Sequence, residues 1–451
     1  MLKNSQETTA LLATFASQLQ YADIPAAARD HVKGILLDTV ACAFAGYASD
    51  ETKQIKGLAT ALGSGSDSSV IGGGQLSIAG ATMLNGYLIT AVTMCDIHRP
   101  THTHVTPEVV PPALAIAERD GLSGRELLVA LAAGLEITTR VGLGSDYPAF
   151  RKRGWHGPGI FGAFGAAASS GWLLRLDAVG MARAFGIAGS QASGTFAAWQ
   201  TPVIKFHQCR GALSGLMAAI LASQDFIATQ EFLTAKDGGL YTTYVDGGKP
   251  ELATDGLGSH WELEQIGLRL WPSGSPMQGI NTALFHLVEH HTIDPNAISA
   301  VRIGVSPSVY DMHGKLPHYK GKFEALISAH YTAAAILRDR ELTLKQYEPE
   351  RFDDPVLRQE AERIAFAADP ALQGVQATAE IEMKDGTKLS ARCDYPRGSF
   401  ENPLSADQLK TKFRTYAAAF KSDAQIVEAI DMIERLEHLP SVRDLMTLLR
   451  S

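Results

Sequence analysis

The chain has 451 residues, of which 45% are hydrophobic and 20% are charged, and its formal net charge is -8. A chain of this length and composition folds into a globular protein with material for one large core and a second domain. The excess of acidic residues and the lack of a basic stripe argue against nucleic acid as a partner.

The cysteines are widely spaced and form no Cys-x-x-Cys pair: Cys42, Cys95, Cys209 and Cys393. This usage indicates reduced thiols and a cytoplasmic protein rather than a disulfide framework. The first twenty residues contain polar side chains throughout and no cleavage-like end. They predict a first helix with Leu12, Phe15 and Leu19 on one face rather than a signal peptide.

Three long stretches carry no Asp, Glu, Lys or Arg: residues 68–95, 157–174 and 184–204. Their high content of small residues predicts buried helices that pack closely. A lipid-facing span of about 20 residues needs more Leu, Ile and Val. We therefore expect no membrane partner.

From about residue 5 to residue 265 the sequence predicts one helix after another. An apolar helix ends at Gly46, where a left-handed residue can close it. Ser123 precedes a helical run with leucines at helical spacing. Residues 207–223 are Ala-, Leu- and Gly-rich and uncharged after Arg210, which favours an enclosed helix.

The pattern changes beyond residue 268. Residues 301–305 alternate between apolar and other side chains, as residues 375–383 and 389–393 also do, which predicts strands. The Asp385-Gly386 pair predicts the turn of a hairpin between the last two. Residues 322–337 predict a helix between the strand regions.

After Pro403 the chain returns to helix, since Ser405 and Gln408 form a capping-box signature. We therefore expect a mainly α protein with a large all-helical domain and a smaller α+β lid domain. The helical domain comprises residues 1–267 and 399–451, and the lid comprises residues 268–398.

Chemistry is expected first in the segment from Cys95 to His104, which ends the first charge-free stretch. It holds one carboxylate and three imidazoles: Asp96, His98, His102 and His104. Such groups suit acid/base catalysis, and they also suit zinc or iron, although no recognised metal-ligand spacing is present. A merely polar loop is the third interpretation.

Two further polar positions adjoin the other charge-free stretches. His156 precedes residues 157–174, and the positive end of a helix there would favour a neutral imidazole. Lys205 ends residues 184–204 and precedes His207, so it can bind a substrate carboxylate. The plainer interpretations are a capping residue and a surface lysine. We expect these polar ends to meet in one cleft.

A literal G-x-G-x-x-G occurs at Gly157, Gly159 and Gly162, with Asp177 about twenty residues after the first glycine. A dinucleotide site needs an apolar strand immediately before this pattern, but residues 151–156 are basic and aromatic. We interpret the glycines as helix-packing positions. The sequence also lacks a Gly-x-Ser-x-Gly nucleophile elbow.

Taken together, these segments resemble the MmgE/PrpD family, which includes 2-methylcitrate dehydratase, cis-aconitate decarboxylase and iminodisuccinate epimerase. The resemblance spans nearly the whole chain. It is carried by residues 37–41 (LDTVA), Asn85-Gly86, Gly154-Trp155-His156 before residues 162–168, Lys205-Phe206-His207 before Gly211-Ala212, and Tyr331 after Phe323.

The resemblance implies a fold, an assembly and a set of catalytic residues. Family members have a helical domain and an α+β lid, work without metal or organic cofactor, and are commonly homodimers. The family's catalytic positions fall on Asp96, His104 (His102 if the gap is placed elsewhere), His156, Lys205 and Tyr331. We expect substrate binding to involve His98, His207, Arg269 and Ser275.

Two motifs depart from the family pattern. An Asp-x-Asp-Asp cluster is here Thr93-Met94-Cys95-Asp96, which retains only the last acid. A Lys-x-aromatic-Pro motif followed by histidine is here Arg269-Leu270-Trp271-Pro272, with Met277 and Gln278 where the histidine would lie.

We therefore expect a cofactor-independent lyase or isomerase that abstracts a proton α to a carboxylate of a small di- or tricarboxylic acid. Such a reaction needs a positioned base and cations that stabilise enediolate-like charge. His156 or His104 would be the base, Asp96 its orienting group, Lys205 and Arg269 the carboxylate-binding cations, and Tyr331 a proton donor. Residues 151–153 (RKR) would steer the anionic substrate.

Two alternatives stay open on the sequence alone. One is a metal-dependent hydrolase or lyase that uses the loop histidines as ligands. The other is a non-catalytic protein that binds a metabolite, as the missing acids suggest. The sequence does not decide between dehydration, decarboxylation and epimerisation.

Overall fold

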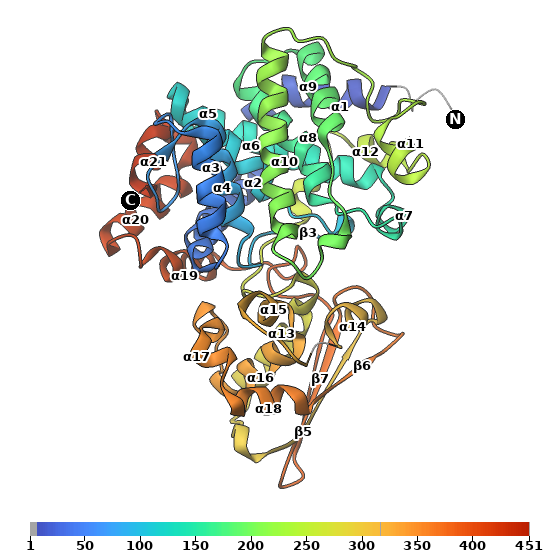
Figure 1. Ribbon diagram of the computed structural model, residues 1–451, viewed down its shortest axis with the longest axis vertical. Helices are drawn as coiled ribbons and strands as arrows, with labels where there is room; N and C mark the ends of the chain where they lie inside the picture. Colours follow the sequence, from blue (N-terminus) through green and yellow to red (C-terminus); the bar gives the residue numbers. More distant parts are fainter. Residues whose placement is uncertain (1–6, 316, 451) are drawn as a thin grey trace. The chain divides into compact units, whose positions relative to one another are not determined.

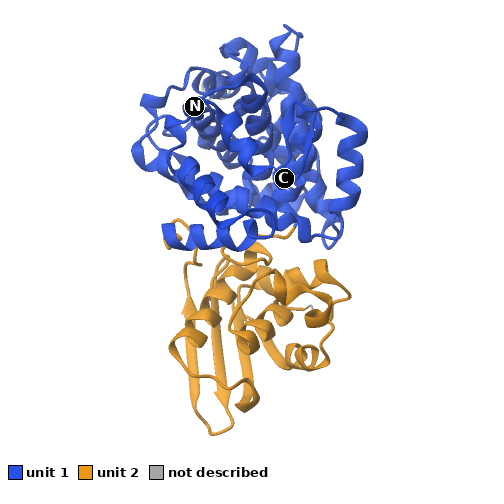
Figure 2. Cartoon of the chain, turned by 90° about the vertical axis from the view of Figure 1, so that its left-hand side faces the viewer, with its two compact units in different colours: residues 1–91, 95–267, 405–451 blue, residues 92–94, 268–404 orange. Residues whose placement is uncertain are grey.

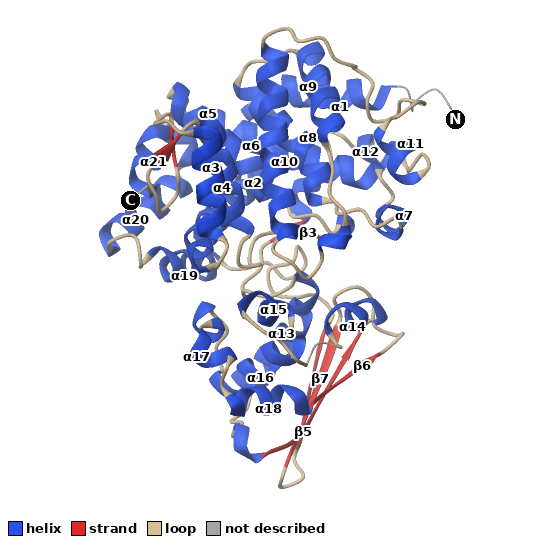
Figure 3. Ribbon diagram, viewed as in Figure 1, coloured by secondary structure: helices blue, strands red, loops and turns tan. Residues whose placement is uncertain are grey.

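A computed structural model describes residues 7–315 and 317–450, which form two compact units (Figure 2). Of the described residues, unit 1 comprises 7–91, 95–267 and 405–450, and unit 2 comprises 92–94, 268–315 and 317–404. Helices predominate in the chain as a whole, and the longer strands belong to unit 2 (Figure 3).

The helices of unit 1, with η for 3-10 helices, are α1 (Thr8–Gln18), η2 (Tyr21–Asp23), α2 (Ala26–Ala45), η3 (Gly46–Ala48), α3 (Thr52–Gly63), α4 (Ile78–Thr90), η4 (Arg99–Thr101), α5 (Thr106–Asp120), α6 (Gly124–Gly144), α7 (Tyr147–Lys152), α8 (Pro158–Leu173), α9 (Ala178–Gln191), η5 (Phe196–Ala198), α10 (Val203–Ser223), α11 (Leu240–Val245), α12 (Pro250–Thr254), η6 (Glu262–Gln265), α19 (Ala406–Ala417), α20 (Asp423–Glu434), η10 (Leu436–His438) and α21 (Val442–Leu449). Two short antiparallel ladders join β1 (Ser68–Ser69) to β2 (Gln75–Leu76) and β3 (Ile97–His98) to β4 (Ile266–Gly267).

Helix α8 forms the centre of unit 1, and every one of its residues is buried. It packs against α5, α6, α9 and α10, and it lies beside α10 in Figure 1. Its Gly and Ala side chains let the neighbouring backbones approach closely. The charge-free stretch that begins at Gly157 is therefore a core helix.

The C-terminal helices pack on α2 in the same unit. Lys412 on α19 donates a 2.6 Å hydrogen bond to Asp38 on α2, and both side chains are 1% exposed. Asp38 therefore ties the last segment of the chain to the first helices.

Gly46 does not have the left-handed conformation expected at the end of α2. Its φ is -60°, and the chain continues into η3. A Cβ at this position would lie 2.1 Å from the carbonyl oxygen of Leu88 on α4. Glycine is needed here because two helices approach each other, not because the backbone turns.

The helices of unit 2 are η7 (Ser275–Met277), α13 (Gln278–His290), η8 (Pro295–Ala297), α14 (Pro307–His313), α15 (Lys322–Ile327), α16 (Ala329–Asp339), η9 (Leu344–Tyr347), α17 (Pro349–Phe352) and α18 (Pro355–Arg363). Its strands are β5 (Ile298–Val305), β6 (Ile364–Ala368), β7 (Ala377–Met383) and β8 (Lys388–Cys393).

The strand order in unit 2 is β6-β5-β7-β8. The expected hairpin is present, since β7 and β8 pair antiparallel around Asp385-Gly386. Strand β6, which pairs parallel to β5, was not predicted from the sequence. The inward residues of β5 and β7 alternate as expected and meet α13 and α16 in the core.

The single helix expected over residues 322–337 is wrong, because α15 and α16 are separate helices. Ser328 interrupts them in an extended conformation, and its hydroxyl accepts a hydrogen bond from the backbone N–H of Tyr331. A serine in this role competes with the helical backbone and starts a new helix.

Candidate active site

The segment from Cys95 to His104 forms a tight loop that begins with β3. His98 and Thr103 exchange two backbone hydrogen bonds of 2.8 and 3.2 Å, and η4 lies between them. Arg99 starts the single turn, Pro100 is its second residue, and His102 ends it with a φ of +45°. The four polar side chains of this short segment therefore point in different directions.

Asp96 uses its carboxylate to cap helix α5. It accepts hydrogen bonds from the backbone N–H groups of Val105 (2.7 Å) and Thr106 (3.1 Å) and from the Thr106 hydroxyl (2.5 Å). A carboxylate at a helix N-terminus satisfies unpaired N–H groups and complements the helix dipole. Burial nevertheless raises the pKa of Asp96 to about 6.

His104 is held by the main chain of Asp96. Its Nδ1 lies 2.6 Å from the Asp96 carbonyl oxygen. Because a carbonyl can only accept, His104 in its neutral form carries its proton on Nδ1 and its lone pair on Nε2. The Asp96 backbone therefore fixes the tautomer of His104, and the charge of the Asp96 side chain also interacts with this imidazole.

His98 and His102 make their main contacts outside the group formed by His156 and Lys205, although His102 is within electrostatic reach of His98 and His104. His98 is fully buried, with Nδ1 on the Thr101 hydroxyl (2.7 Å) and Nε2 on Glu262 (2.9 Å), so both ring nitrogens serve the loop itself. The exposed His102 ring stacks on Tyr147 at 4.8 Å. The geometry gives His98 a structural position rather than a substrate-binding one.

His156 and His207 form a pair between the start of α8 and the first turns of α10. Their Nδ1 atoms are 3.1 Å apart, and the backbone N–H of His156 donates to the Gly194 carbonyl (3.0 Å). Burial holds the pKa of His156 well below its usual range, and the neighbouring His207, His104 and Lys205 lower it further.

Lys205 lies in the first turn of α10 and is 4% exposed. It is therefore not the surface lysine of the plainer interpretation. Its effect on the pKa of His156 places its ammonium within electrostatic reach of the imidazole. The structure thus brings His104, His156, Lys205 and His207 together at one end of α8 and α10.

The glycines of the G-x-G-x-x-G pattern are close-approach positions. A Cβ at Gly157 would lie 2.8 Å from Thr103 Oγ1, and one at Gly159 would lie 2.8 Å from the His207 carbonyl oxygen. A Cβ at Gly162 would lie 2.4 Å from Glu108 Cγ. These glycines let the Cys95–His104 loop, α10 and α5 pack directly on α8.

Two residues beside this cluster, Arg210 and Glu108, were not predicted from the sequence as site residues. Arg210 on α10 donates to the carbonyls of Gly159, Gln191 and Ser193, which fixes the loop behind His156. Glu108 on α5 is fully buried, and neither carboxyl oxygen has a hydrogen-bond partner among the described residues. The sequence offers one signal for this residue: Glu108 is the one charged residue between Val105 and Ala117, among apolar residues and prolines.

The other three expected site residues belong to unit 2. Arg269 is buried and donates to the Ser273 carbonyl (3.0 Å), and the half-buried Ser275 starts η7. Tyr331 is fully buried in the unit 2 core, where its hydroxyl donates to the Gln346 carbonyl. That position gives Tyr331 a packing role and does not favour a proton donor to substrate.

Among residues 7–315 and 317–450, no group of three or more His, Cys, Asp or Glu side chains is arranged to hold a metal ion. The loop histidines contact different groups, since His98 faces Glu262, His102 faces Tyr147 and His104 faces the main chain of Asp96.

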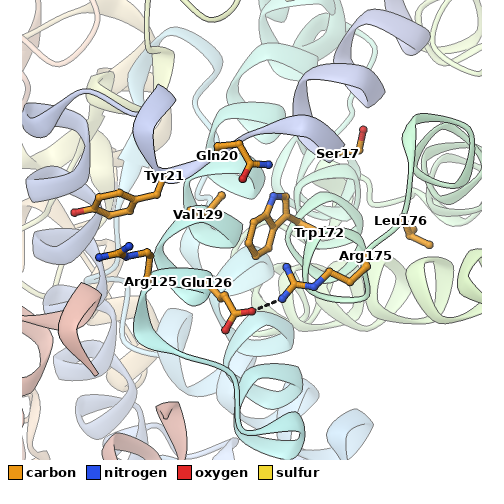
Figure 4. Close-up of a pocket in the computed structure, with 9 residues that line it drawn as sticks. All are labelled: Ser17, Gln20, Tyr21, Arg125, Glu126, Val129, Trp172, Arg175 and Leu176. Atoms are coloured by element: carbon orange, nitrogen blue, oxygen red, sulfur yellow. Dashed lines mark hydrogen bonds and ion pairs between the residues drawn. The ribbon is translucent and has the colours of Figure 1, made fainter. Parts of the chain in front are cut away.

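A pocket of about 400 Å³ lies elsewhere in unit 1, between α1, η2, α6 and the end of α8 (Figure 4). Arg175 points toward Glu126 along one wall, with Trp172 beside them. Trp172 is fourteen residues along α8 from Pro158, which is about 21 Å of helix. This pocket is therefore not the site of the histidine cluster.

Helix α6 (Gly124–Gly144) is long and apolar enough to cross a membrane, and so is the bent pair formed by residues 26–48 and 52–63 when taken together. In α6, 94% of the apolar 18-residue stretch is buried within the protein. This burial is typical of the core helix of a folded domain.

Comparison with known proteins gives consistent matches over the chain. The model of the MmgE/PrpD N-terminal domain matches residues 10–253, and that of the MmgE/PrpD C-terminal domain matches residues 271–437. A cis-aconitate decarboxylase-like protein, oryM, of Aspergillus oryzae is 27% identical over 98% of this chain and 97% of its own length. The cis-aconitate decarboxylase of Aspergillus terreus is 27% identical (98% and 95%), and that of Homo sapiens is 25% identical (93% and 89%).

Proposed function

This chain belongs to the MmgE/PrpD family, and we propose that it is a lyase that decarboxylates a small unsaturated tricarboxylic acid of the cis-aconitate type. The observation that carries the proposal is the cluster of His156 and Lys205, which are buried, with His207 and His104, which are half-buried. The relatives named cis-aconitate decarboxylase support the choice of reaction and substrate.

Lys205 is the group proposed to bind a substrate carboxylate. A buried ammonium forms a charge-assisted hydrogen bond that is stronger than a neutral one and is little screened by water. In the decarboxylation, the C–C bond to the leaving carboxylate breaks and CO2 departs. The electron pair passes into the conjugated system of a remaining carboxylate, where the Lys205 charge stabilises it.

The carbanion-like intermediate must then take up one proton at carbon. His104 is our candidate donor. Its neutral form carries the lone pair on Nε2, so Nε2 can take up a proton from solvent and then donate it to the carbon. An imidazolium at this position is balanced by the Asp96 carboxylate, which lies within electrostatic reach. The same two groups would serve a proton abstraction in the dehydratase or epimerase reaction.

His156 is proposed to orient the substrate as a neutral imidazole. Its pKa is held well below the usual range, so it adds no charge to the site near pH 7. The His207 ring fixes its orientation through the shared proton between the two Nδ1 atoms. Neither Tyr331 nor His98 is retained in this proposal, because protein groups occupy the Tyr331 hydroxyl and both His98 nitrogens.

We further propose that the enzyme works without metal or organic cofactor, in the cytoplasm and as a homodimer. Unchanged activity after treatment with a chelator, together with elemental analysis, would support the first point and would separate it from the metal-dependent alternative. The oligomeric state is measured by sedimentation or light scattering.

The deciding experiment is proton NMR of the purified protein with a panel of polycarboxylates in deuterated water. Decarboxylation replaces one carboxylate by one deuterium and releases CO2. Epimerisation replaces an α-proton by deuterium, and dehydration loses an α-proton and a hydroxyl group as water, both without loss of carbon. Turnover of cis-aconitate to a dicarboxylate is the expected result. Ligand-dependent thermal stabilisation without turnover across the panel would instead favour a binding protein.

A further inference from the structure

Glu108 occupies a position that carboxylates normally avoid. It is the third residue of α5, is fully buried, and presents both carboxyl oxygens without a hydrogen-bond partner among the described residues. Its Cγ lies against Gly162 on α8 and Gly211 on α10. Each of those glycines is six residues beyond a member of the histidine and lysine cluster, His156 and Lys205 respectively.

Two acids therefore meet at the start of one helix. Asp96 accepts three hydrogen bonds there, whereas Glu108 accepts none from the described residues. Hydrogen bonds to a carboxylate favour its charged form, and two like charges at one site disfavour double ionisation. The pair is thus arranged to hold its single negative charge on Asp96.

Arg210 only partly offsets a charge on Glu108, because its attraction lowers the pKa of Glu108 less than burial and Asp96 raise it. The Arg210 guanidinium is within electrostatic reach, but it donates to the carbonyls of Gln191, Ser193 and Gly159 and to the Ser214 hydroxyl. The other titratable groups that face Glu108 are Asp96, Cys95 and Cys209, and none of them supplies positive charge.

Burial raises the pKa of Glu108 well above its usual range, and the Asp96 charge raises it further. A neutral carboxyl is compatible with the apolar helix interface, whereas a carboxylate there would lie unpaired in a medium of low polarity. It would also add a second negative charge behind the site that is proposed to receive an anion.

We propose that Glu108 is a positioning residue that holds a proton at the junction of α5, α8 and α10 and so keeps the neighbouring cluster of His104, His156, Lys205 and His207 receptive to an anionic substrate. The claim that Glu108 keeps the site receptive to an anion rests on the proposed function. The claim that Glu108 is protonated does not, because it follows from the packing and hydrogen bonding of Glu108.

The direct test is infrared difference spectroscopy between wild-type protein and Glu108→Gln at pH 7. The expected difference is the carbonyl band of a protonated carboxylic acid, shifted in deuterated water and absent from the variant. If the variant instead lacks a carboxylate band that the wild-type protein shows, Glu108 is ionised and the proposal is overturned. No substrate is required, so this result is independent of the enzymatic activity.

Glu118→Gln provides a matched control on the same helix. Glu118 is also buried, but its carboxylate accepts hydrogen bonds from the Ser69 backbone N–H (2.6 Å) and hydroxyl (2.5 Å). Its replacement is expected to leave the protonated-acid band in place. Should Glu108→Gln fold poorly, the same band can be followed in wild-type protein alone, where it must be present at pH 7.

The functional test compares kcat and KM of wild type and Glu108→Gln across alkaline pH. The expected variant has kcat and KM within about twofold of wild type at neutral pH, and its KM rises less at high pH, because the glutamine cannot ionise. A tenfold or larger loss of kcat in a folded variant would overturn the positioning role, since it would mean that the Glu108 carboxyl itself transfers a proton.

Discussion

The Nδ1 atoms of His156 and His207 lie 3.1 Å apart, although the two residues are separated by 51 positions in the chain. At that distance one imidazole donates and the other accepts, so each ring fixes the tautomer of the other. The pair is neutral at physiological pH, because burial lowers the pKa of both rings. This relationship gives the first two predictions.

Replacing His207 with alanine is expected to lower kcat/KM by roughly fivefold, equivalent to the loss of a hydrogen bond worth about 1 kcal/mol. His207→Asn is expected to retain more activity, because its amide can occupy the position of Nδ1. Steady-state kinetics of the two variants make the comparison. Equal losses in both would mean that the hydrogen bond does not orient His156.

Acidification is expected to destabilise the protein through His156. The native pKa lies well below the ordinary value of 6.5, so below that pH the unfolded chain binds a proton that the native state rejects. Stability from this residue is therefore present above pH 6.5 and falls as the pH decreases below it. Urea unfolding at pH 7.5 and pH 5.5 should show a smaller loss in His156→Asn than in wild type; identical losses would contradict the assignment.

Lys205→Met is expected to reduce kcat/KM by about tenfold to a hundredfold, because a hydrogen bond to a charged group contributes about 1.5–3 kcal/mol. Lys53→Met is the matched control, since Lys53 is exposed on α3. Both variants should retain the wild-type circular dichroism spectrum. Normal turnover by Lys205→Met would remove this residue from the mechanism.

The Asp38–Lys412 pair predicts a large effect on stability. Lys412→Met removes the 2.6 Å ammonium partner from a carboxylate that is 1% exposed. Breaking a buried pair costs about 3–5 kcal/mol. Lys410 is on α19, the same helix as Lys412, and makes a more exposed contact with Glu434 on α20. Lys410→Met breaks this contact and should cost no more than about 1 kcal/mol. Denaturant unfolding of the two variants measures the contrast, and similar midpoints would contradict it.

Gly162→Ala and Gly57→Ala are expected to change stability in opposite directions. A methyl group at Gly162 meets Glu108 Cγ at 2.4 Å, and overpacking of this kind costs about 1–3 kcal/mol. Nothing lies within 4 Å of a Cβ at Gly57 on α3, where alanine stabilises the helix by about 0.5–1 kcal/mol. Thermal melting distinguishes them, and a neutral Gly162→Ala would show that the interface is loosely packed.

Much of the fold could be predicted because it depends on local pattern. The alternation in residues 301–305 and 375–383 specifies strands with one covered face, and the Ser405–Gln408 capping box starts α19 as expected. The small residues of α8 specify a buried helix whatever its neighbours are. Such features need only the period of the side chains and the chemistry of helix ends.

The strand β6 and the break at Ser328 could not be predicted in the same way. β6 is a short strand with little burial, and its pairing with β5 joins segments about sixty residues apart. Ser328 ends one helix and caps the next, a choice between two local structures that the surrounding core decides.

By itself, the sequence determined that the protein is mainly helical with an α+β part and that it resembles the MmgE/PrpD family, and it singled out His104, His156 and Lys205 as candidates for chemistry. Only the tertiary structure decided which polar groups are left for chemistry. Glu262, 164 residues away, engages His98, and the N-terminal turn of α5 takes up the Asp96 carboxylate. Hydrogen-bond partners that are distant in sequence determine these roles, because a polar side chain already satisfied by the protein has little left to offer a substrate.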